Sequence, residues 1–246
     1  MANQTGKHVA RLMAAKTEPS PITALRDMLA TAFAADIAAV TPMVCDVMRE
    51  DMLDAATPAR RDLIRIAVGT VARNPGALAM DVAQIFRVRF DATLLGAASA
   101  KGSAASSLDL ALMDETLLEI SLALDQCATR LKEQASAEMF QLTARVAAML
   151  DKPSLDDADN PIAPRAFACT LADALGTMGL GSEQRLAVFK AFGPPLLSIA
   201  PDLYDCANEL LTELGVLAGF TAQYGRPIIA KAAPSPRPDP DRKSVV

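Results

Sequence analysis

The sequence contains no tryptophan and a single histidine in 246 residues, and aromatic residues make up only 4% of it. Nucleophilic Ser-His-Asp or Cys-His catalysis and histidine-rich metal sites need imidazoles inside the folded body. The one histidine, His8, lies near the start of the chain in a polar leader. The motifs G-x-S-x-G, H-E-x-x-H and G-x-G-x-x-G are absent as well. The sequence therefore assigns no catalytic, cofactor-binding or metal-binding residue, and it leans away from an enzyme.

Cysteine is scarce, and no two cysteines have the close spacing of a zinc site or a redox motif. Each of the four lies in an apolar helical pattern and is expected to be a reduced core residue: Cys45, Cys127, Cys169 and Cys206. The most apolar segment, 28–45, is interrupted by Asp36 and Pro42, and it falls short of the ~18–20 uncharged residues of a membrane span. No secretory signal is visible. These observations predict a cytoplasmic protein without a membrane span.

The chain also lacks an excess of positive charge, with 24 Lys and Arg against 29 Asp and Glu and a net charge of −5. A nucleic-acid binder needs a basic face to neutralise phosphates, so this balance argues against a nucleic-acid partner.

What the sequence does contain is helix-forming apolar residues, because hydrophobic residues make up 51% and are mostly Ala, Leu, Val and Met. Apolar residues recur at steps of three and four, as in Leu25, Met28, Leu29, Phe33 and Ile37. No segment alternates apolar and polar residues with period two. The predicted fold is all-α, a multi-helix bundle or orthogonal helical array of about seven to nine helices with no sheet.

Proline and glycine mark the expected helix ends. Helices are expected to begin at four cap-proline pairs: Thr41-Pro42, Thr57-Pro58, Asn74-Pro75 and Asn160-Pro161. Gly193-Pro194-Pro195 is expected to end or kink a helix, and the glycines at 179–181 and Gly215 are expected to stop helices.

Two helices near the middle and end of the chain have wide apolar stripes. In the segment after Asp114, Leu118 and Leu122 widen the stripe, which predicts a helix buried on more than one side. The last clear helix has the stripe Leu203, Ala207, Leu210, Leu211 and Leu214. This spacing predicts that another helix covers the face that carries Leu210. If that helix belongs to the same chain, truncation of Leu210 to alanine is expected to cost roughly 2–5 kcal/mol. If it belongs to a partner or a second copy, the truncation is expected to weaken that association instead.

Composition divides the chain into five parts. We expect a disordered leader (1–20), an N-terminal helical region (21–95), a flexible connector rich in small residues (96–107), a C-terminal helical region (108–220) and a disordered Pro-rich tail (221–246). The two helical regions are expected to pack together as one domain.

Two charged clusters offer alternative sites. The loop from Leu155 to Pro164 contains Asp156, Asp157 and Asp159, which with Asp114 are the candidate ligands of a carboxylate-based metal enzyme. The same loop is also explained by a structural role, in which its Asp and Asn side chains satisfy helix amides. The second alternative is a small-anion or second-messenger binding module. In that case the side chains expected to face the anion are those of Arg61, Arg65, Arg87 and Arg89.

Several blocks resemble one bacterial family. The segments LMDETLLEISLALDQCATRL, FQLTARVAAML, LDDADNPIAPRAFACTL and LYDCANELLTELGVL are similar, in order and spacing, to the proteobacterial domain-of-unknown-function family 1631. The segment from Arg60 to Leu94 resembles the preceding region of that family more loosely. Some members have a thymidine phosphorylase label, but that enzyme class needs a phosphate-binding glycine loop and an α/β domain, which this sequence lacks.

The function most consistent with these features is a non-catalytic protein-interaction or regulatory adaptor that acts through helix faces. Protein partners and a possible homo-oligomer are expected, and no cofactor is. The sequence does not identify the partner or the biological process.

Overall fold

The computed structural model describes residues 20–96, 115–223 and 226–228, and within these ranges the chain forms seven helices and one short hairpin. The elements are α2 (Pro21–Leu53), α3 (Pro58–Arg73), α4 (Pro75–Leu94), α6 (Glu115–Gln134), α7 (Ser136–Met149), α8 (Pro164–Thr177), α9 (Ser182–Glu213), β1 (Thr221–Gln223) and β2 (Arg226–Ile228). The predicted all-α class is confirmed.

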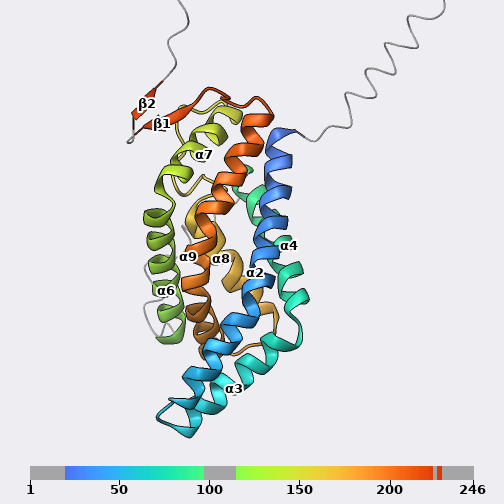
Figure 1. The fold of residues 1–246 in the computed structure, drawn as a ribbon, viewed down its shortest axis with the longest axis vertical. Helices are drawn as coiled ribbons and strands as arrows, with labels where there is room; N and C mark the ends of the chain where they lie inside the picture. The colour runs from blue at the N-terminus through green and yellow to red at the C-terminus, as the bar shows by residue number, and fades with distance from the viewer. Residues whose placement is uncertain (1–19, 97–114, 224–225, 229–246) are drawn as a thin grey trace, which may run out of the picture.

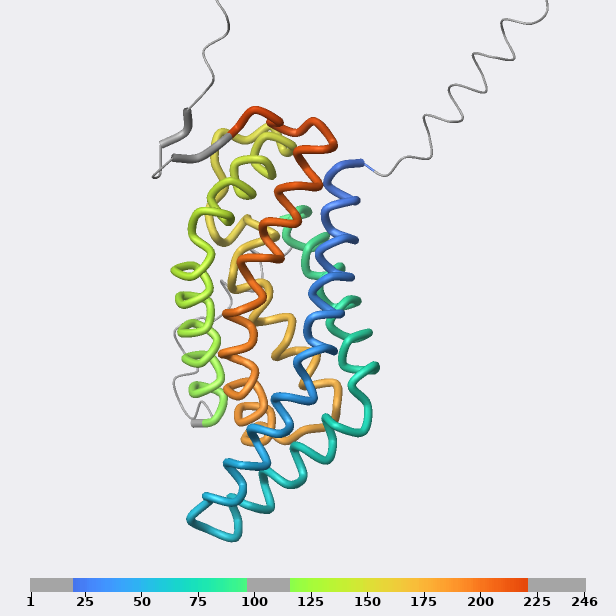
Figure 2. The backbone as a smooth tube through the Cα atoms, viewed as in Figure 1, coloured from blue at the N-terminus to red at the C-terminus, as the bar shows by residue number. Residues whose placement is uncertain are grey.

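The two longest helices, α2 and α9, run side by side in opposite directions along the molecule (Figure 1). The helix α4 packs against α2 and α8, α6 packs against α9 and α8, and α7 packs against α9. The backbone trace in Figure 2 places α3 at the end of the molecule opposite the start of α2. Helices from both halves of the sequence therefore surround a shared interior.

Aromatic rings connect the halves at the centre of this interior. The ring of Phe33 on α2 meets that of Phe167 on α8 edge-on, with the centroids 5.2 Å apart. Phe167 also contacts Phe86 on α4 at 5.0 Å and Tyr204 on α9 at 5.6 Å. Few aromatic residues are available, and four of them are concentrated at the point where α2, α4, α8 and α9 converge.

The prediction that a new helix begins at Pro42 is wrong, because α2 continues through it from Pro21 to Leu53. Proline removes one backbone donor from a helix. The hydroxyl of Thr41 donates to the carbonyl of Ile37 over 2.6 Å and adds a bond next to this gap. Val44, Cys45 and Met48 are buried beyond the proline, so packing keeps the two parts of the helix in line.

The sequence predicts that Gly193-Pro194-Pro195 either ends a helix or kinks it. The prediction of a helix end is wrong, since α9 extends from Ser182 to Glu213 with Pro194, Pro195 and Pro201 inside it. Phe192 is buried before the prolines, and Leu196 and Ala200 are buried after them. The lost amide donors are offset by continuous burial of one face against α2 and α6.

Several other helix boundaries follow the sequence closely. The Thr57 side chain accepts from the amide of Arg60 over 3.2 Å, and α3 begins at Pro58 as expected. Positive φ angles of 75° at Gly179 and 78° at Gly215 confirm the two predicted helix stops. Only glycine adopts such angles without steric strain.

Three predicted core residues lie outside the core. On α9, Leu211 is fully buried, whereas Leu210 is half-buried and Leu214 is 45% exposed. Packing against α2, α6 and α7 selects the side of α9 that carries Leu203, Ala207 and Leu211. Cys206 is exposed, although Cys45 and Cys127 are buried, and all four cysteines are free thiols.

A hairpin joins Thr221 to Ile228 in antiparallel register, in a part of the chain where no strand was expected. Strands of three residues are too short for a period-two pattern to be visible. The rest of the predicted tail, the residues 97–107 of the predicted connector and residues 1–19 of the predicted leader lie outside the described residues.

The helix α2 has the length and apolar composition of a helix that crosses a membrane, and 44% of its most apolar window is buried inside the protein. A core helix meets the same criterion, and α2 contacts α3, α4 and α9. Length and hydropathy alone are weak evidence for a membrane span.

Candidate functional site

The outward side of α6 carries leucines that no described element covers. Leu117, Leu118 and Leu122 are 46%, 48% and 52% exposed. The opposite side of α6 buries Ile120, Ala123, Cys127 and Leu131 against α8 and α9. The prediction that Leu118 and Leu122 bury this helix on a second side is therefore wrong within the described part of the chain. We call Leu117, Leu118 and Leu122 the α6 leucine face.

Two hollows follow the side of α6 that meets α9. The first, of about 350 Å³, is polar and is lined by Arg60, Glu119, Glu183 and Lys190 among others. The second, of about 280 Å³, is lined largely by apolar atoms, including those of Phe189, Pro194 and Leu197. Cys127 borders the second hollow, but burial raises the pKa of its thiol to about 11. A thiol that stays protonated at neutral pH is a poor nucleophile.

A third hollow, of about 530 Å³, lies on the other side of α6, against the start of α8. Two ion pairs border it. The ammonium Nζ of Lys132 lies 2.7 Å from Oδ2 of Asp157, and Arg165 pairs with Asp125. Each cation is matched by a carboxylate, so this hollow has no excess charge that would select an anion or a metal ion.

The loop from Leu155 to Pro164 forms the wall of the third hollow, and its contacts are those of a structural loop. Asn160 is 4% exposed; its Oδ1 accepts from the amide of Ile162 over 3.1 Å, and its Nδ2 donates to Thr143 over 3.1 Å. The hydroxyl of Tyr204 donates to the carbonyl of Ile162 over 2.9 Å, and burial raises the pKa of this phenol. The helix α8 begins at Pro164, not at Pro161 as predicted, because Asn160 and Pro161 belong to this turn.

The predicted carboxylate ligands do not converge where they are described. Asp157 pairs with Lys132, and Asp156 and Asp159 are exposed. Asp114 lies outside the described residues. In residues 20–96, 115–223 and 226–228, no group of three or more His, Cys, Asp or Glu side chains is placed to hold a metal ion.

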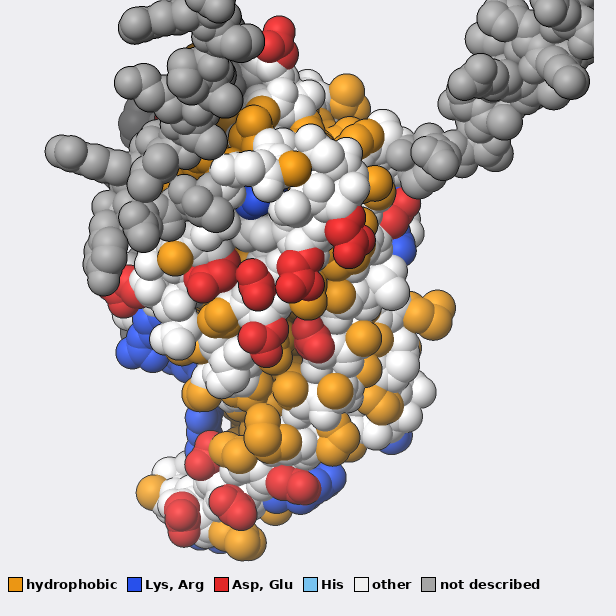
Figure 3. Space-filling view, turned by 45° about the horizontal axis from the view of Figure 1, so that its top comes forward, with side chains coloured by type: hydrophobic (Ala, Val, Ile, Leu, Met, Phe, Trp, Pro, Cys, Tyr) orange, Lys and Arg blue, Asp and Glu red, His pale blue; other side chains and the backbone are white. Residues whose placement is uncertain are grey.

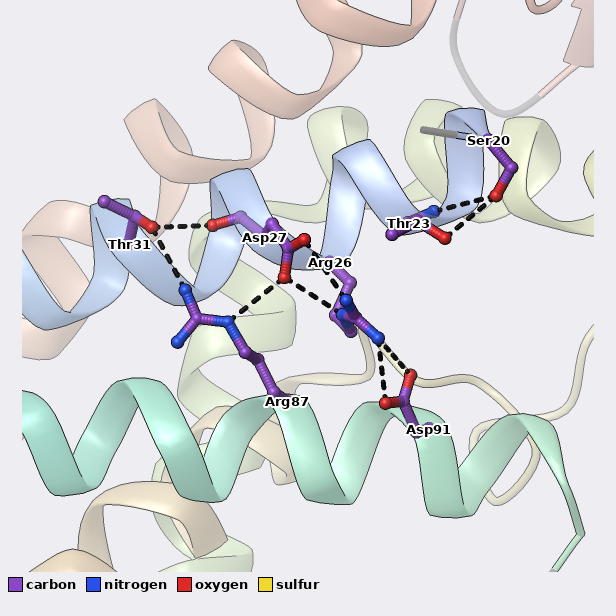
Figure 4. A network of polar contacts seen from close by, with 7 residues as sticks. All are labelled: Ser20, Thr23, Arg26, Asp27, Thr31, Arg87 and Asp91. Atoms are coloured by element: carbon purple, nitrogen blue, oxygen red, sulfur yellow. Dashed lines mark hydrogen bonds and ion pairs between the residues drawn. The ribbon is translucent and has the colours of Figure 1, made fainter. Parts of the chain in front are cut away.

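The four arginines proposed to face an anion each have a separate partner. Arg61 donates to the carbonyl of Ala55, and Arg65 pairs with Asp62 over 3.1 Å. Arg89 pairs with Asp173 on α8. Arg87 lies in a network between α2 and α4, where its Nε donates to Asp27 over 3.1 Å (Figure 4).

In the same network, Nη1 of Arg26 donates to both carboxylate oxygens of Asp91, with N···O distances of 3.1 and 2.9 Å (Figure 4). Arginines that are already paired with carboxylates of neighbouring helices hold those helices together. None of the four lines any of the three hollows around α6.

One polar residue that no sequence pattern marks organises the packing of α7 against α9. Arg145 on α7 is 3% exposed and has no carboxylate partner among the described residues. Its guanidinium donates to Asn208 over 2.6 Å, to Thr212 over 3.0 Å and to the carbonyl of Phe220 over 3.3 Å. Burial lowers the pKa of Arg145. A single arginine within the apolar pattern of α7 gives no sequence signal of such a role.

These features define a helical protein in which one helix, α6, exposes neighbouring leucines beside three hollows. Residues 17–215 match the family model described as the N-terminal domain of a protein of unknown function, DUF1631. The chain belongs to this family, and the resemblance seen in its sequence is confirmed. No curated protein and no solved structure matches the chain.

Proposed function

We propose that this protein is a non-catalytic interaction module that binds an apolar helix of a partner protein on the α6 leucine face. The observation that carries the proposal is the exposure of three neighbouring leucines, each about half exposed, on a helix whose opposite side is in the core. Contiguous exposed apolar residues are unusual on a monomeric protein and mark interaction surfaces.

The surroundings of the α6 leucine face support a helical partner. Leu118 and Leu122 are separated by one helical turn, which matches the spacing of apolar side chains on an amphipathic helix. Hollows on both sides of α6 leave room for side chains of a partner to extend past the leucines. The flanking charges are mixed, with Glu119, Arg130 and Lys132 exposed, so a partner of mixed charge fits best.

Neither alternative has comparable support. An enzyme with a carboxylate-bound metal needs converging ligands, and Asp157 is instead paired with Lys132. A second-messenger module needs free cations, and Arg65, Arg87 and Arg89 are paired with carboxylates of the protein. The free cysteines are consistent with a reducing compartment, and we propose the cytoplasm as the location.

The test compares the full chain with the variant Leu118→Glu/Leu122→Glu and with the control Met80→Glu. Met80 is 73% exposed on α4, away from the α6 leucine face. Substitutions at such exposed sites change the free energy of unfolding by only about 0.5 kcal/mol. Tagged proteins are purified from their own cells, and bound proteins are quantified by mass spectrometry.

We expect the α6 variant to lose at least one partner that the control retains, while both keep the Tm of the unmodified protein. Identical partner sets from both variants would exclude the α6 leucine face as the binding surface. Sedimentation velocity on the same proteins tests a second copy as occupant. A dimer that dissociates only in the α6 variant would replace the proposed partner with a homodimer.

A further inference from the structure

One face of the molecule is strongly acidic because two neighbouring helices lack cations along most of their length. Residues 27–48 of α2 and 191–213 of α9 contain no Lys or Arg. The carboxylates that they present together are Asp36, Asp202, Asp205, Glu209 and Glu213, which we call the acidic band. Figure 3 shows a row of acidic side chains across this face.

The acidic band is uncompensated within the described residues. The four carboxylates from α9 are exposed and Asp36 is half-buried, and none of the five forms an ion pair there. Burial and the nearby charge of Asp202 both raise the pKa of Asp36. Carboxylates that face one another across two helices repel, so a cation placed between them lowers the electrostatic energy.

Apolar residues border the acidic band. On α2, Met43 and Val47 are 50% and 46% exposed, and Val40 is half-buried. On α9, Ile199 is half-buried one turn before Asp202. Hydrophobic side chains lie directly below the acidic row in Figure 3. The face therefore suits a segment that combines positive charge with apolar side chains.

The chain itself contains such a segment, which precedes α2 in the sequence. Residues 7–16 have the sequence KHVARLMAAK, with the cations Lys7, Arg11 and Lys16 and the apolar residues Val9, Leu12 and Met13. Residues 1–19 contain these three cations and a single acidic residue, Glu18. This charge is opposite in sign to that of the acidic band.

The distance from the attachment point permits the contact. Asp36 is 16 residues beyond Ser20, which corresponds to about 24 Å at the helical rise of 1.5 Å per residue. Arg11 is nine residues before Ser20, and an extended chain of that length spans about 30 Å. The end of α9 lies beside the start of α2, so the acidic band begins close to this point (Figure 1). A short tether of this kind gives an effective concentration in the millimolar range.

We propose that residues 7–16 bind within their own chain to the acidic band and its apolar border on α2 and α9. Lys7, Arg11 and Lys16 neutralise the carboxylates, and Val9 covers Val40 and Ile199, the part of the apolar border nearest the start of α2. The proposal does not depend on the α6 leucine face, which lies on another helix.

Cys206, an exposed thiol on α9 between Asp205 and Glu209, provides the site for the test. The full chain with Cys169→Ser is labelled on Cys206 with a nitroxide, since Cys45 and Cys127 are buried. The amide NMR signals of residues 7–16 are then compared in the oxidised and reduced states of the label. We expect these signals to lose most of their intensity in the oxidised state. They should recover it near 1 M salt, where the screening length falls to about 3 Å.

Two triple variants separate the acidic band from general charge effects. Asp202→Asn/Asp205→Asn/Glu209→Gln should restore the signals, whereas Glu119→Gln/Glu133→Gln/Glu183→Gln, which removes three carboxylates elsewhere, should not. In the unlabelled chain, a zero-length carbodiimide should couple Lys7 or Lys16 to a carboxylate of the acidic band. The proposal would be overturned if the signals of residues 7–16 had the same intensity in the oxidised and reduced states of the label. It would also be overturned if both triple variants showed equal broadening. Broadening that disappears on dilution would overturn it too, because it would identify a second copy as the occupant.

Discussion

Two aspartates on the same helix have opposite electrostatic environments. The hydrogen bond from Arg26 lowers the pKa of Asp27 most, and the hydrogen bond from Arg87 adds to this against the opposing effect of burial. Burial raises the pKa of Asp36 most, with Asp202 as a second cause. At the scale of single residues, hydrogen bonds from arginine, burial and nearby carboxylates decide whether an aspartate stabilises the fold.

Replacement of each aspartate by asparagine should therefore change stability in opposite directions at pH 7. Asp27 stabilises the folded state above its unfolded pKa of about 3.9, and this contribution is lost as the pH falls through its lower folded pKa. Asp36 destabilises the folded state above its raised folded pKa and is neutral below about pH 3.9. We expect Asp27→Asn to lower the Tm at pH 7 and Asp36→Asn to raise it.

Thermal denaturation followed by circular dichroism between pH 3 and pH 7 measures both effects, which should shrink toward the acidic end. Shifts of the same sign at pH 7 would contradict the assignment of the two environments.

At the scale of elements, the helices α2 and α9 contain prolines in their interiors and still continue for 33 and 32 residues. A proline costs roughly 3 kcal/mol in a helix interior. This cost is offset because residues on both sides of each proline, such as Phe192 and Leu196, are buried in the same core. Tertiary packing therefore outweighs the helix-breaking tendency of proline when a helix is long and one side of it is covered throughout.

The adjacent residues Leu210 and Leu211 allow a test of which side of α9 is buried. Leu211 is fully buried, so Leu211→Ala should lower the free energy of unfolding by about 2–5 kcal/mol through lost transfer energy and a cavity. Leu210 is half-buried, and Leu210→Ala should cost clearly less. Urea denaturation of both variants gives the comparison. Equal costs, or a larger cost at Leu210, would show that α9 is rotated from the position described.

At the scale of the whole molecule, the core belongs to both halves of the sequence. Phe33 and Phe86 come from the first three helices, and Phe167 and Tyr204 come from the last two. The helix α2 contacts α9 along its length, and α4 contacts α8. Neither half has a complete apolar interior of its own.

A fragment containing residues 21–95 should therefore fail to fold alone. Exposure of Leu25, Leu29, Phe33 and Ile37, all fully buried in the intact chain, should give low helicity or aggregation. Circular dichroism and hydrogen exchange of the fragment, alone and mixed with residues 108–220, test this expectation. A fragment with native-like helicity and cooperative unfolding by itself would show that the two halves are separate domains.

The amino-acid sequence alone determined the helical class and several helix ends of this protein, because these depend on local chemistry. The spacing of Leu25, Leu29 and Phe33 defines a helix face, Thr57 caps α3, and Gly179 and Gly215 adopt positive φ angles at helix ends. Each of these effects acts within a few residues of the chain.

Only the tertiary structure decided which apolar residues are covered and which charges are paired. Leu122 and Leu211 occur in similar leucine-rich helical patterns, yet one is 52% exposed and the other is fully buried, because only the second meets a neighbouring helix. No sequence motif distinguishes Arg87 from Arg145. In the fold, Arg87 donates to Asp27 and Arg145 donates to Asn208, each across a large sequence separation. Packing and charge pairing depend on distances between helices, and those distances are set by the fold as a whole.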